Sequence, residues 1–495
     1  MSVKKLPALL LAAALLAGMA PALGQETAPG LAKYVFFFIG DGMSNPQTTA
    51  AQYYNGTMEN RESEAPVSKG LSFTGFPVVG LQLTPDATSF APDSAATATA
   101  MATGQKTTSG TVNYLPDEET PLVTITQYAW EAGMKIGVVT SVSLDHATPA
   151  VQYARASHRS DYYDIALQGL SNGLLTFLGG GGFRQPEGRR QDKRNLLDIA
   201  RENGWRIVND NQGIRAISAA SGPTLAIVPD LAGGNAMQYE VDRLAIINGG
   251  GDSLSLAEMT RAAIRALEEG EEGFFLMVEG GKIDWAAHAN DVLTMIHEVN
   301  ALDAAVSEAL EFARIHPDET LIVVTGDHET GGLSLGYALT GYDVRMELLR
   351  RQSMSFEAFD RVVAELRRKE AGFDEVLRAI TQNFGLTEDS DRSLRLTGRE
   401  MKQLQDAYAM NLLPSDERDY GDEEKISYGD YQPLSVTVVR ILARKAGLNF
   451  STFAHTGLTL PVYAYGAGSG HFSGLYDNTE IFRHFMAAMG LSPRE

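Results

Sequence analysis

Six runs of apolar residues, each the length of a β-strand, recur along the chain with helix-like stretches between them. They lie at residues 34–40, 135–141, 224–228, 273–280, 320–326 and 460–466. Amphipathic segments such as 255–269, 292–314 and 435–446 separate some of them. Continuous apolar strands that alternate with helices are typical of a parallel sheet covered on both faces. The sequence therefore predicts an α/β fold with a mostly parallel central sheet and helices on both faces.

Residues 340–432 interrupt this alternation with a polar, charge-rich segment. Its stretch FDRVVAELRRKEAGFDEVLRAITQNF has a helical pattern, and the segment is too long for an ordinary connection between two elements. We interpret it as a helical insertion, or cap, on an α/β domain formed by residues 30–339 and 433–495.

The N-terminal residues have the composition of an export signal. Lys4 and Lys5 precede an apolar run from Leu6 to Met19, and small residues follow near Gly24. The run is too short to span a bilayer, so residues 1–24 predict a cleaved signal peptide and a periplasmic or secreted protein with no membrane anchor. The chain contains no cysteine, which excludes thiolate nucleophiles and cysteine-type zinc sites.

The formal net charge is −21, and loss of Lys4 and Lys5 with the signal would take it to −23. Such an acidic surface repels nucleic acid and anionic membranes, so neither is an expected partner. A site for an anionic substrate would have to supply strong positive charge of its own.

Polar side chains able to bind a metal follow four of the predicted strands. Asp41 follows FFFIG, the run IGVVTSVS leads to DHATPA, Glu279 follows FFLMV, and Asp327 with His328 follows LIVVTG. In open parallel sheets, sites form outside the carboxyl ends of the strands. We therefore expect these groups to meet at one edge of the sheet.

The spacing of these groups favours zinc over other metals. Asp284 and His288 are four residues apart, which places them on one face if the segment is helical. His455 precedes the last strand, and Asp327 adjoins His328. Without thiolates, zinc is bound by such imidazoles and carboxylates. A lone Asp41 in GDGMS is by itself more typical of a turn.

Two other patterns have ordinary interpretations. The segment PDSAATATA places Asp93 and Ser94 before a run of small residues, which is typical of a helix N-cap. The glycine-rich runs at 178–183 and 466–472 do not fit the dinucleotide-binding fingerprint.

Six motifs occur in an order that resembles the alkaline phosphatase family. They are FFIGDGMS, PDSAATATAMATG, DHATPA with an arginine eleven residues after Thr148, VEGGKIDWAAH, TGDHETGG, and HTG followed by VYAYG. The resemblance spans residues 33–335 and 436–490. It implies the family's α/β fold, with the signal and the insertion outside it.

The resemblance implies two zinc ions and one magnesium ion per chain. Asp284, His288 and His455 would bind the first zinc, and Ser94, Asp327 and His328 the second. Asp41 would bridge the second zinc and magnesium. Thr148 and Glu279 would complete the magnesium site, whose oxygen ligands suit that ion.

The same resemblance implies hydrolysis of small-molecule phosphate monoesters to an alcohol and inorganic phosphate at alkaline pH. Ser94 would be the nucleophile and form a phosphoserine intermediate. Arg159 would bind two phosphoryl oxygens with its planar guanidinium, and Asp93 would orient Arg159. The family also implies a homodimer.

Two positions beside the metal sites vary across the family and are His146 and Trp285 here. Histidine binds magnesium poorly and tryptophan supplies no charge, so the metal preference of the third site stays open. Packing against the site wall is an equal interpretation of Trp285.

Two alternatives remain. A phosphodiesterase or sulfatase of the same superfamily would share most of these residues. A non-catalytic protein that binds metal or phosphate would share the scaffold, although the intact nucleophile and ligand set disfavour it.

Overall fold

The computed structural model describes residues 30–63, 65–219, 222–388, 393–414, 418 and 420–494. The predicted signal peptide, residues 1–24, lies outside the described residues. Within the described part of the chain, no helix is both long enough and apolar enough to cross a membrane.

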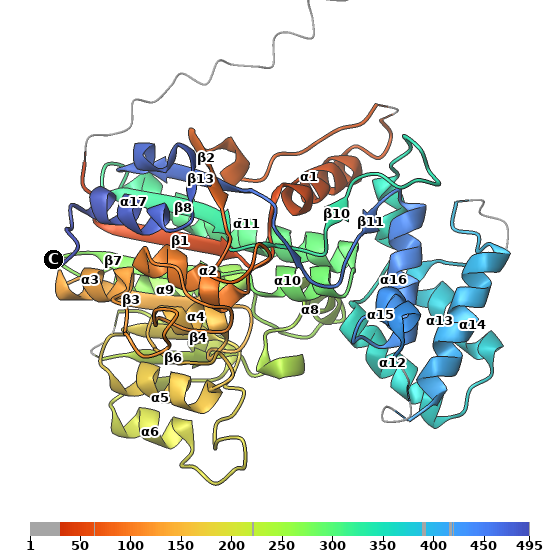
Figure 1. Cartoon of the computed structure of the whole chain (residues 1–495), viewed down its shortest axis with the longest axis horizontal. Coiled ribbons are helices and arrows are strands. Elements are labelled where there is room, and N and C mark those ends of the chain that lie inside the picture. The colour runs from red at the N-terminus through yellow and green to blue at the C-terminus, as the bar shows by residue number, and fades with distance from the viewer. Residues whose placement is uncertain are drawn as a thin grey trace, which may run out of the picture.

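A ten-stranded sheet forms the centre of the molecule, in the order β14-β2-β13-β8-β1-β7-β3-β4-β6-β5 (Figure 1). Its strands are β1 (Tyr34–Gly40), β2 (Val78–Leu83), β3 (Lys135–Thr140), β4 (Phe177–Gly180), β5 (Arg206–Val208), β6 (Thr224–Ile227), β7 (Phe274–Glu279), β8 (Thr320–Gly326), β13 (Leu460–Gly466) and β14 (Gly474–Asp477). The neighbouring strands from β8 to β5 all run parallel, and β13 is antiparallel to both β8 and β2. The predicted mostly parallel α/β sheet is confirmed.

All six predicted strands are present, and the sequence missed β2, β4, β5 and β14. The missed strands have three to six residues, and side chains of β2 and β14 are partly exposed. Strand β4 lies in the glycine-rich run at 177–182, whose glycines hide the apolar pattern.

Helices cover both faces of the sheet because successive side chains of a strand point to opposite sides. Along β1, Tyr34 and Phe36 belong to one buried cluster, and Val35 and Phe37 belong to the other. The first cluster includes side chains of α1 (Asn45–Glu59), α8 (Glu240–Asn248), α9 (Leu256–Leu267) and α11 (Val292–Ile315). The second includes side chains of α2 (Ser94–Thr103), α3 (Ile125–Glu131), α4 (Ala147–Val151), α5 (Tyr162–Ser171), α6 (Leu196–Glu202) and α17 (Glu480–Met489).

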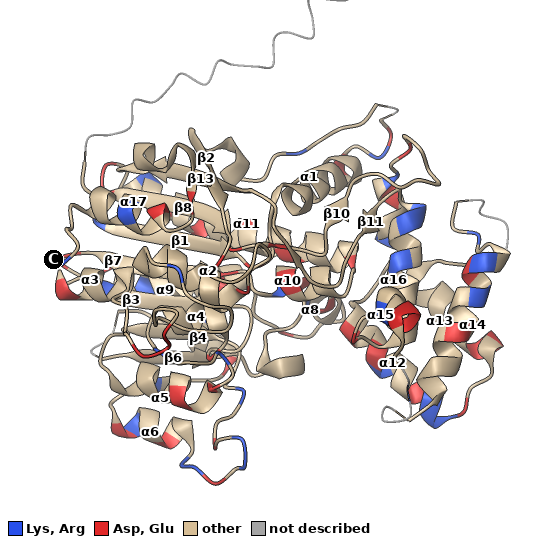
Figure 2. Ribbon diagram, in the orientation of Figure 1, with Lys and Arg blue, Asp and Glu red and all other residues tan. Residues whose placement is uncertain are grey.

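A group of helices lies at one end of the molecule, on the right of the view in Figure 1. It contains α12 (Phe356–Arg368), α13 (Phe373–Phe384), α14 (Gly398–Leu412), α15 (Asp422–Tyr428) and α16 (Pro433–Lys445). Acidic and basic side chains are interspersed over these helices (Figure 2). The helix α16 begins at Pro433, just after the predicted boundary at residue 432, yet it contacts the four helices α12 to α15 that precede the boundary. The boundary therefore stays a prediction.

The strand register brings four chain segments to one edge of the sheet. Ile39 of β1 is paired with Glu279 of β7, and Thr140 of β3 is paired with the same glutamate. Gly40 of β1 is paired with Gly326 of β8. The residues that follow these strands therefore emerge side by side. The helix α10 (Lys282–His288) begins three residues after β7, at the same edge.

Candidate metal and phosphate site

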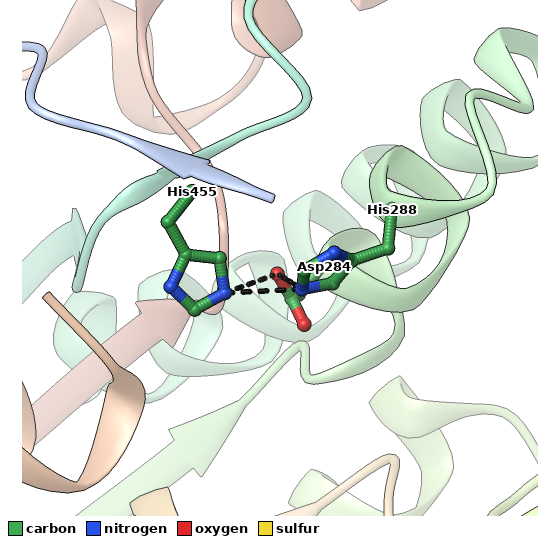
Figure 3. Close-up of side chains that lie close together, drawn as sticks. All are labelled: Asp284, His288 and His455. Atoms are coloured by element: carbon green, nitrogen blue, oxygen red, sulfur yellow. Dashed lines mark hydrogen bonds and ion pairs between the residues drawn. The ribbon is translucent and has the colours of Figure 1, made fainter. Parts of the chain in front are cut away.

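The side chains of Asp284, His288 and His455 form the most accessible cluster at this edge (Figure 3). Asp284 and His288 lie one turn apart on α10, and His455 comes from the short strand β12 (His455–Thr456). His288 Nε2 lies 3.0 Å from His455 Nε2 and 3.3 Å from Asp284 Oδ1. His455 Nε2 lies 3.6 Å from the same carboxylate oxygen.

The hydrogen bonds of the two imidazoles fix which nitrogen is free. His288 Nδ1 donates to the carbonyl oxygen of Phe453, and His455 Nδ1 donates to that of Pro92 at 2.6 Å. A carbonyl only accepts, so both protons lie on Nδ1 and both Nε2 lone pairs face each other when the rings are neutral. Two lone pairs and a carboxylate directed at one point suit a cation, and the nitrogen and oxygen ligands suit zinc.

A second cluster lies deeper and is completely buried. His328 Nε2 lies 3.4 Å from Asp41 Oδ1, 3.4 Å from Asp327 Oδ2 and 3.2 Å from Ser94 Oγ. Asp327 Oδ1 accepts from the backbone N–H groups of Gly42 and His328, which aims Oδ2 at the cluster. Neither oxygen of Asp41 has a hydrogen-bond partner among the described residues.

Gly42 allows this segment to approach α10 closely. Its φ is +74°, and a Cβ atom at this position would lie 2.9 Å from the Asp284 Cα atom and 2.8 Å from Thr330 Oγ1. Any larger residue would push the loop after β1 away from α10. The glycine therefore holds the first two clusters next to each other.

A third group combines oxygen atoms with one imidazole. Side-chain atoms of Asp41, His146 and Glu279 lie within 4.8 Å of one another. Glu279 Oε2 accepts from the Thr140 hydroxyl, whereas Oε1 is buried without a partner among the described residues. The Thr148 hydroxyl, in the first turn of α4, is buried beside the Glu279 carboxylate. The oxygen atoms suit magnesium, and the imidazole does not.

Burial of so many acids raises their pKa values. Desolvation is the main cause at Asp41, Asp327 and Glu279, and the neighbouring carboxylates add to it. The pKa of Asp327 rises to about 8 and that of Glu279 to about 7, while that of Asp41 lies well above its usual value. Burial also lowers the pKa of His328 and His455. Bound cations would offset this repulsion between carboxylates and match the unpaired oxygens.

Ser94 is the first residue of α2, and Asp93 is its N-cap. Every residue of α2 is buried, and its alanines pack in the core beneath the sheet edge. Asp93 Oδ1 accepts from Ala96 N, and Asp93 Oδ2 accepts from Arg159 Nη1 at 2.9 Å. Ser94 therefore lies at a helix N-terminus, which favours anions, beside a fixed guanidinium.

His146 and Trp285 flank this region. Arg159 Nη2 donates to His146 Nε2 at 3.3 Å, because a guanidinium has no acceptor. Burial and the positive charges of Arg159 and Arg184 lower the pKa of His146 well below its usual value. The half-buried Trp285 packs edge-on against the His146 ring, with 5.9 Å between the ring centroids, and it also lines the open cavity. These contacts fit both a packing role in the site wall and a role beside the metal sites.

A cavity of about 890 Å³ opens above Ser94 and Arg159. Asp284, His288 and His455 lie on its inner wall, and residues of α12 with Tyr431 form its outer wall. The structure brings all thirteen side chains singled out from the sequence to this edge: they belong to the three clusters, line the cavity or contact residues that do.

Several residues of the site carry no sequence signal. The hydroxyls of Thr140 and Thr330 donate to Glu279 and Asp284, and their partners are remote in sequence. Tyr239 and Phe356 line the cavity as ordinary apolar residues of their segments. Only the tertiary contacts identify these four.

The comparisons with known proteins agree with one another. The model of the family described as alkaline phosphatase matches residues 32–491. Alkaline phosphatase 3 of Bacillus subtilis is 29% identical over 466 residues, which cover 92% of this chain and 89% of that protein.

Two crystal structures have the same architecture. The Thermus thermophilus alkaline phosphatase superposes with a TM-score of 0.77 at 26% identity and covers 96% of each chain. The cold-active alkaline phosphatase of Shewanella sp. has a TM-score of 0.74 at 26% identity, covering 93% of this chain and 100% of that one.

Proposed function

The chain belongs to the alkaline phosphatase family, and we propose that it hydrolyses phosphate monoesters at alkaline pH through a phosphoserine formed on Ser94. The observation that carries this proposal is the position of the Ser94 hydroxyl. It lies 3.2 Å from His328 Nε2, at a helix N-terminus, in a cavity that Arg159 also lines. Homologues across the matched region are named alkaline phosphatases, which supports phosphomonoester hydrolysis as the activity.

We assign three cations to the three clusters. Asp284, His288 and His455 would hold one zinc, and Asp327, His328 and Ser94 a second. Asp41 would supply its carboxylate to the second zinc and to a magnesium ion, which Glu279 and Thr148 would also hold. The unpaired buried oxygens and inward-facing nitrogens support this assignment. When bound, the ions would supply positive charge to the reacting oxygens and lower the pKa of the serine hydroxyl.

The residues of the chain would then act as follows. The Arg159 guanidinium, held by Asp93, donates two N–H groups to phosphoryl oxygens and aligns phosphorus with Ser94 Oγ. Ser94 Oγ forms a bond to phosphorus as the ester oxygen leaves with its electron pair and takes up a proton. Water then cleaves the phosphoserine, which releases phosphate and restores the hydroxyl. The amide N–H groups at the start of α2 stabilise the charge on the phosphoryl group.

The runner-up function is hydrolysis of phosphodiesters or sulfate esters at the same site. Arg159 and the magnesium ligands would contact oxygens that the second substituent of a diester blocks, which favours monoesters. The test compares p-nitrophenyl phosphate with methyl p-nitrophenyl phosphate on protein loaded with zinc and magnesium. We expect a much higher kcat/KM for the monoester, and faster cleavage of the diester would overturn the proposal.

The remaining expectations concern the cell and the assembly. The export pattern at residues 1–24 supports action outside the cytoplasm on small-molecule substrates. The family resemblance supports a homodimer, and the acidic net charge disfavours nucleic acid or an anionic membrane as partner.

A further inference from the structure

The cavity above Ser94 extends well beyond the space that one phosphoryl group needs. We call the part lined by Trp285, Arg184, the loop at Gly233 and Gly234, and the helix α12 its outer half. Under the proposed function, on which this inference rests, the outer half contacts the leaving group. The side chains there would then determine which phosphomonoesters are preferred.

The insertion provides a fixed wall to this half of the cavity. Gln352 Nε2 donates to both oxygens of Asp291 at 2.8 and 2.9 Å, and Phe356 N donates to Asp291 Oδ2 at 2.9 Å. Ser355 donates from its backbone and its hydroxyl to the carboxylate of Asp242. The start of α12 is thus bound to two buried or largely buried acids of the α/β body, so a leaving group meets a preformed surface.

The two arginines of the outer half differ in their partners. Arg361 lies 3.6 Å from Glu357, whose Oε1 also accepts from Gly233 N. Arg184 is exposed, and no ion pair among the described residues includes its guanidinium. The guanidinium lies over the Tyr162 ring, 5.0 Å from the centroid, and its charge also interacts with the buried Asp145, whose Oδ2 accepts from the Arg184 backbone N–H at 2.8 Å. Of the two arginines, only Arg361 is ion-paired with a carboxylate of the described part of the chain.

The position of Arg184 in the cavity follows from its neighbours. A Cβ atom on Gly234 would lie 2.9 Å from the Trp285 ring and 3.9 Å from Arg184 Cζ, so both side chains adjoin the same backbone. Arg184 therefore lies near the Trp285 ring, on the cavity that Ser94 and Arg159 also line.

We propose that Arg184, together with the face of Trp285, forms a subsite for a second anionic group on the leaving group. The preferred substrates are then phosphomonoesters that carry a second phosphate, above all on an aromatic or otherwise apolar framework. The guanidinium would bind the second phosphate with charge-assisted hydrogen bonds, and the ring would contact the framework.

Hydroquinone monophosphate and hydroquinone bisphosphate test this subsite, because they differ only in the second phosphate. We expect a higher kcat/KM for the bisphosphate in the unmodified enzyme. Arg184→Ala should lower the bisphosphate-to-monophosphate ratio of kcat/KM about fivefold, the effect of one partly exposed charged contact. The monophosphate rate and inhibition by inorganic phosphate should change less than twofold, as Arg159 is untouched.

Arg361→Ala is the matched control, since it removes a paired arginine from the same cavity. It should change the ratio by less than twofold. A bisphosphate-to-monophosphate ratio that stays unchanged in Arg184→Ala would overturn the subsite. An equal fall of this ratio in both variants would also overturn it, because the effect would then come from the net charge of the cavity.

Binding separates this inference from the proposed function. If the metal-loaded enzyme hydrolyses neither compound, the proposed function fails, and calorimetric titration of the Ser94→Ala protein still tests the subsite. Tighter binding of the bisphosphate that depends on Arg184 supports the subsite. Equal binding of the two compounds contradicts it.

Discussion

Asp93 has three hydrogen-bond partners for its two carboxylate oxygens. Oδ1 accepts from the backbone N–H groups of Ala96 and Gly110, both at 3.0 Å, and Oδ2 holds Arg159 at 2.9 Å. One side chain therefore caps the helix that begins at Ser94 and fixes the guanidinium beside it. The sequence indicated both roles, but as alternatives, because spacing alone does not show that one carboxylate has room for both.

Replacing Arg159 tests the phosphate-binding role. Arg159→Ala removes two charge-assisted hydrogen bonds to phosphate, so the inhibition constant of inorganic phosphate should rise about tenfold to a hundredfold. Zinc content should not change, because among the described residues the Arg159 side chain forms hydrogen bonds with Asp93 and His146 and with none of the residues of the two assigned zinc sites. Steady-state inhibition and metal analysis measure the two quantities.

Asp93→Asn is the control for Arg159, since it keeps an N-cap side chain and removes only the charge that holds the guanidinium. Its effect on phosphate inhibition should be smaller. If the inhibition constant of Arg159→Ala matches that of the unmodified enzyme, a different group binds the phosphate.

At the level of single residues, the sequence pointed to metal-binding residue types at a distinctive spacing and missed residue types that occur throughout the chain. Asp284 and His288 at one-turn spacing stand out in any helix. Thr330 and Arg184 do not, because threonines and arginines occur everywhere and only a tertiary contact gives them a role.

Among the elements, α12 links the insertion to the site. Its N-cap Ser355 is buried, caps Ala358 N, and donates to Asp242. Ser355→Ala would lose the cap and leave a largely buried carboxylate short of a partner. The free energy of unfolding should fall by about 1–3 kcal/mol.

Urea denaturation measures this loss, with Ser353→Ala as the control. Ser353 is exposed, and its hydroxyl makes only long contacts, of 3.3 and 3.4 Å, to Asn383. Equal stability of the Ser355 and Ser353 variants would show that α12 is not anchored in this way.

Prediction of the elements succeeded where burial is continuous and failed where it is not. Strands β1, β7 and β8 are buried along their whole length and read as unbroken apolar runs. Strand β5 has three residues, and β2 alternates between buried and exposed positions at the side of the sheet. The insertion at residues 340–432 was inferred from its polarity and stays a prediction, whereas the contact of α12 with the cavity depends on hydrogen bonds to Asp242 and Asp291 that no sequence pattern predicts.

For the molecule as a whole, metal removal should make stability depend on pH. The pKa of Asp327 is raised from 3.8 to about 8, and that of Glu279 from 4.5 to about 7. Without cations the folded state binds these protons more tightly than the unfolded state, so stability falls as pH rises toward the folded pKa values. Burial lowers the pKa of His328 and His455, so their protonation in the unfolded state acts in the opposite direction near pH 6.5 and fades as the pH rises above it.

The measurement is the thermal midpoint at pH 6.5 and at pH 8, with and without bound metal. Chelator-treated protein should melt at a lower temperature at pH 8 than at pH 6.5. Protein loaded with zinc and magnesium should show a much smaller change, because the cations favour the ionised carboxylates. Equal midpoints in the chelated protein would contradict the raised pKa values of Asp327 and Glu279, and an equally large change in the loaded protein would contradict metal binding by these carboxylates.

The central claim is that Ser94 receives the phosphoryl group. The most direct measurement incubates metal-loaded protein with substrate or inorganic phosphate, quenches it in acid, and locates the added phosphoryl group by peptide mass spectrometry. The account predicts a phosphoryl group on the peptide that contains Ser94, and none in Ser94→Ala. Labelling of another residue, or labelling that persists in Ser94→Ala, would contradict it.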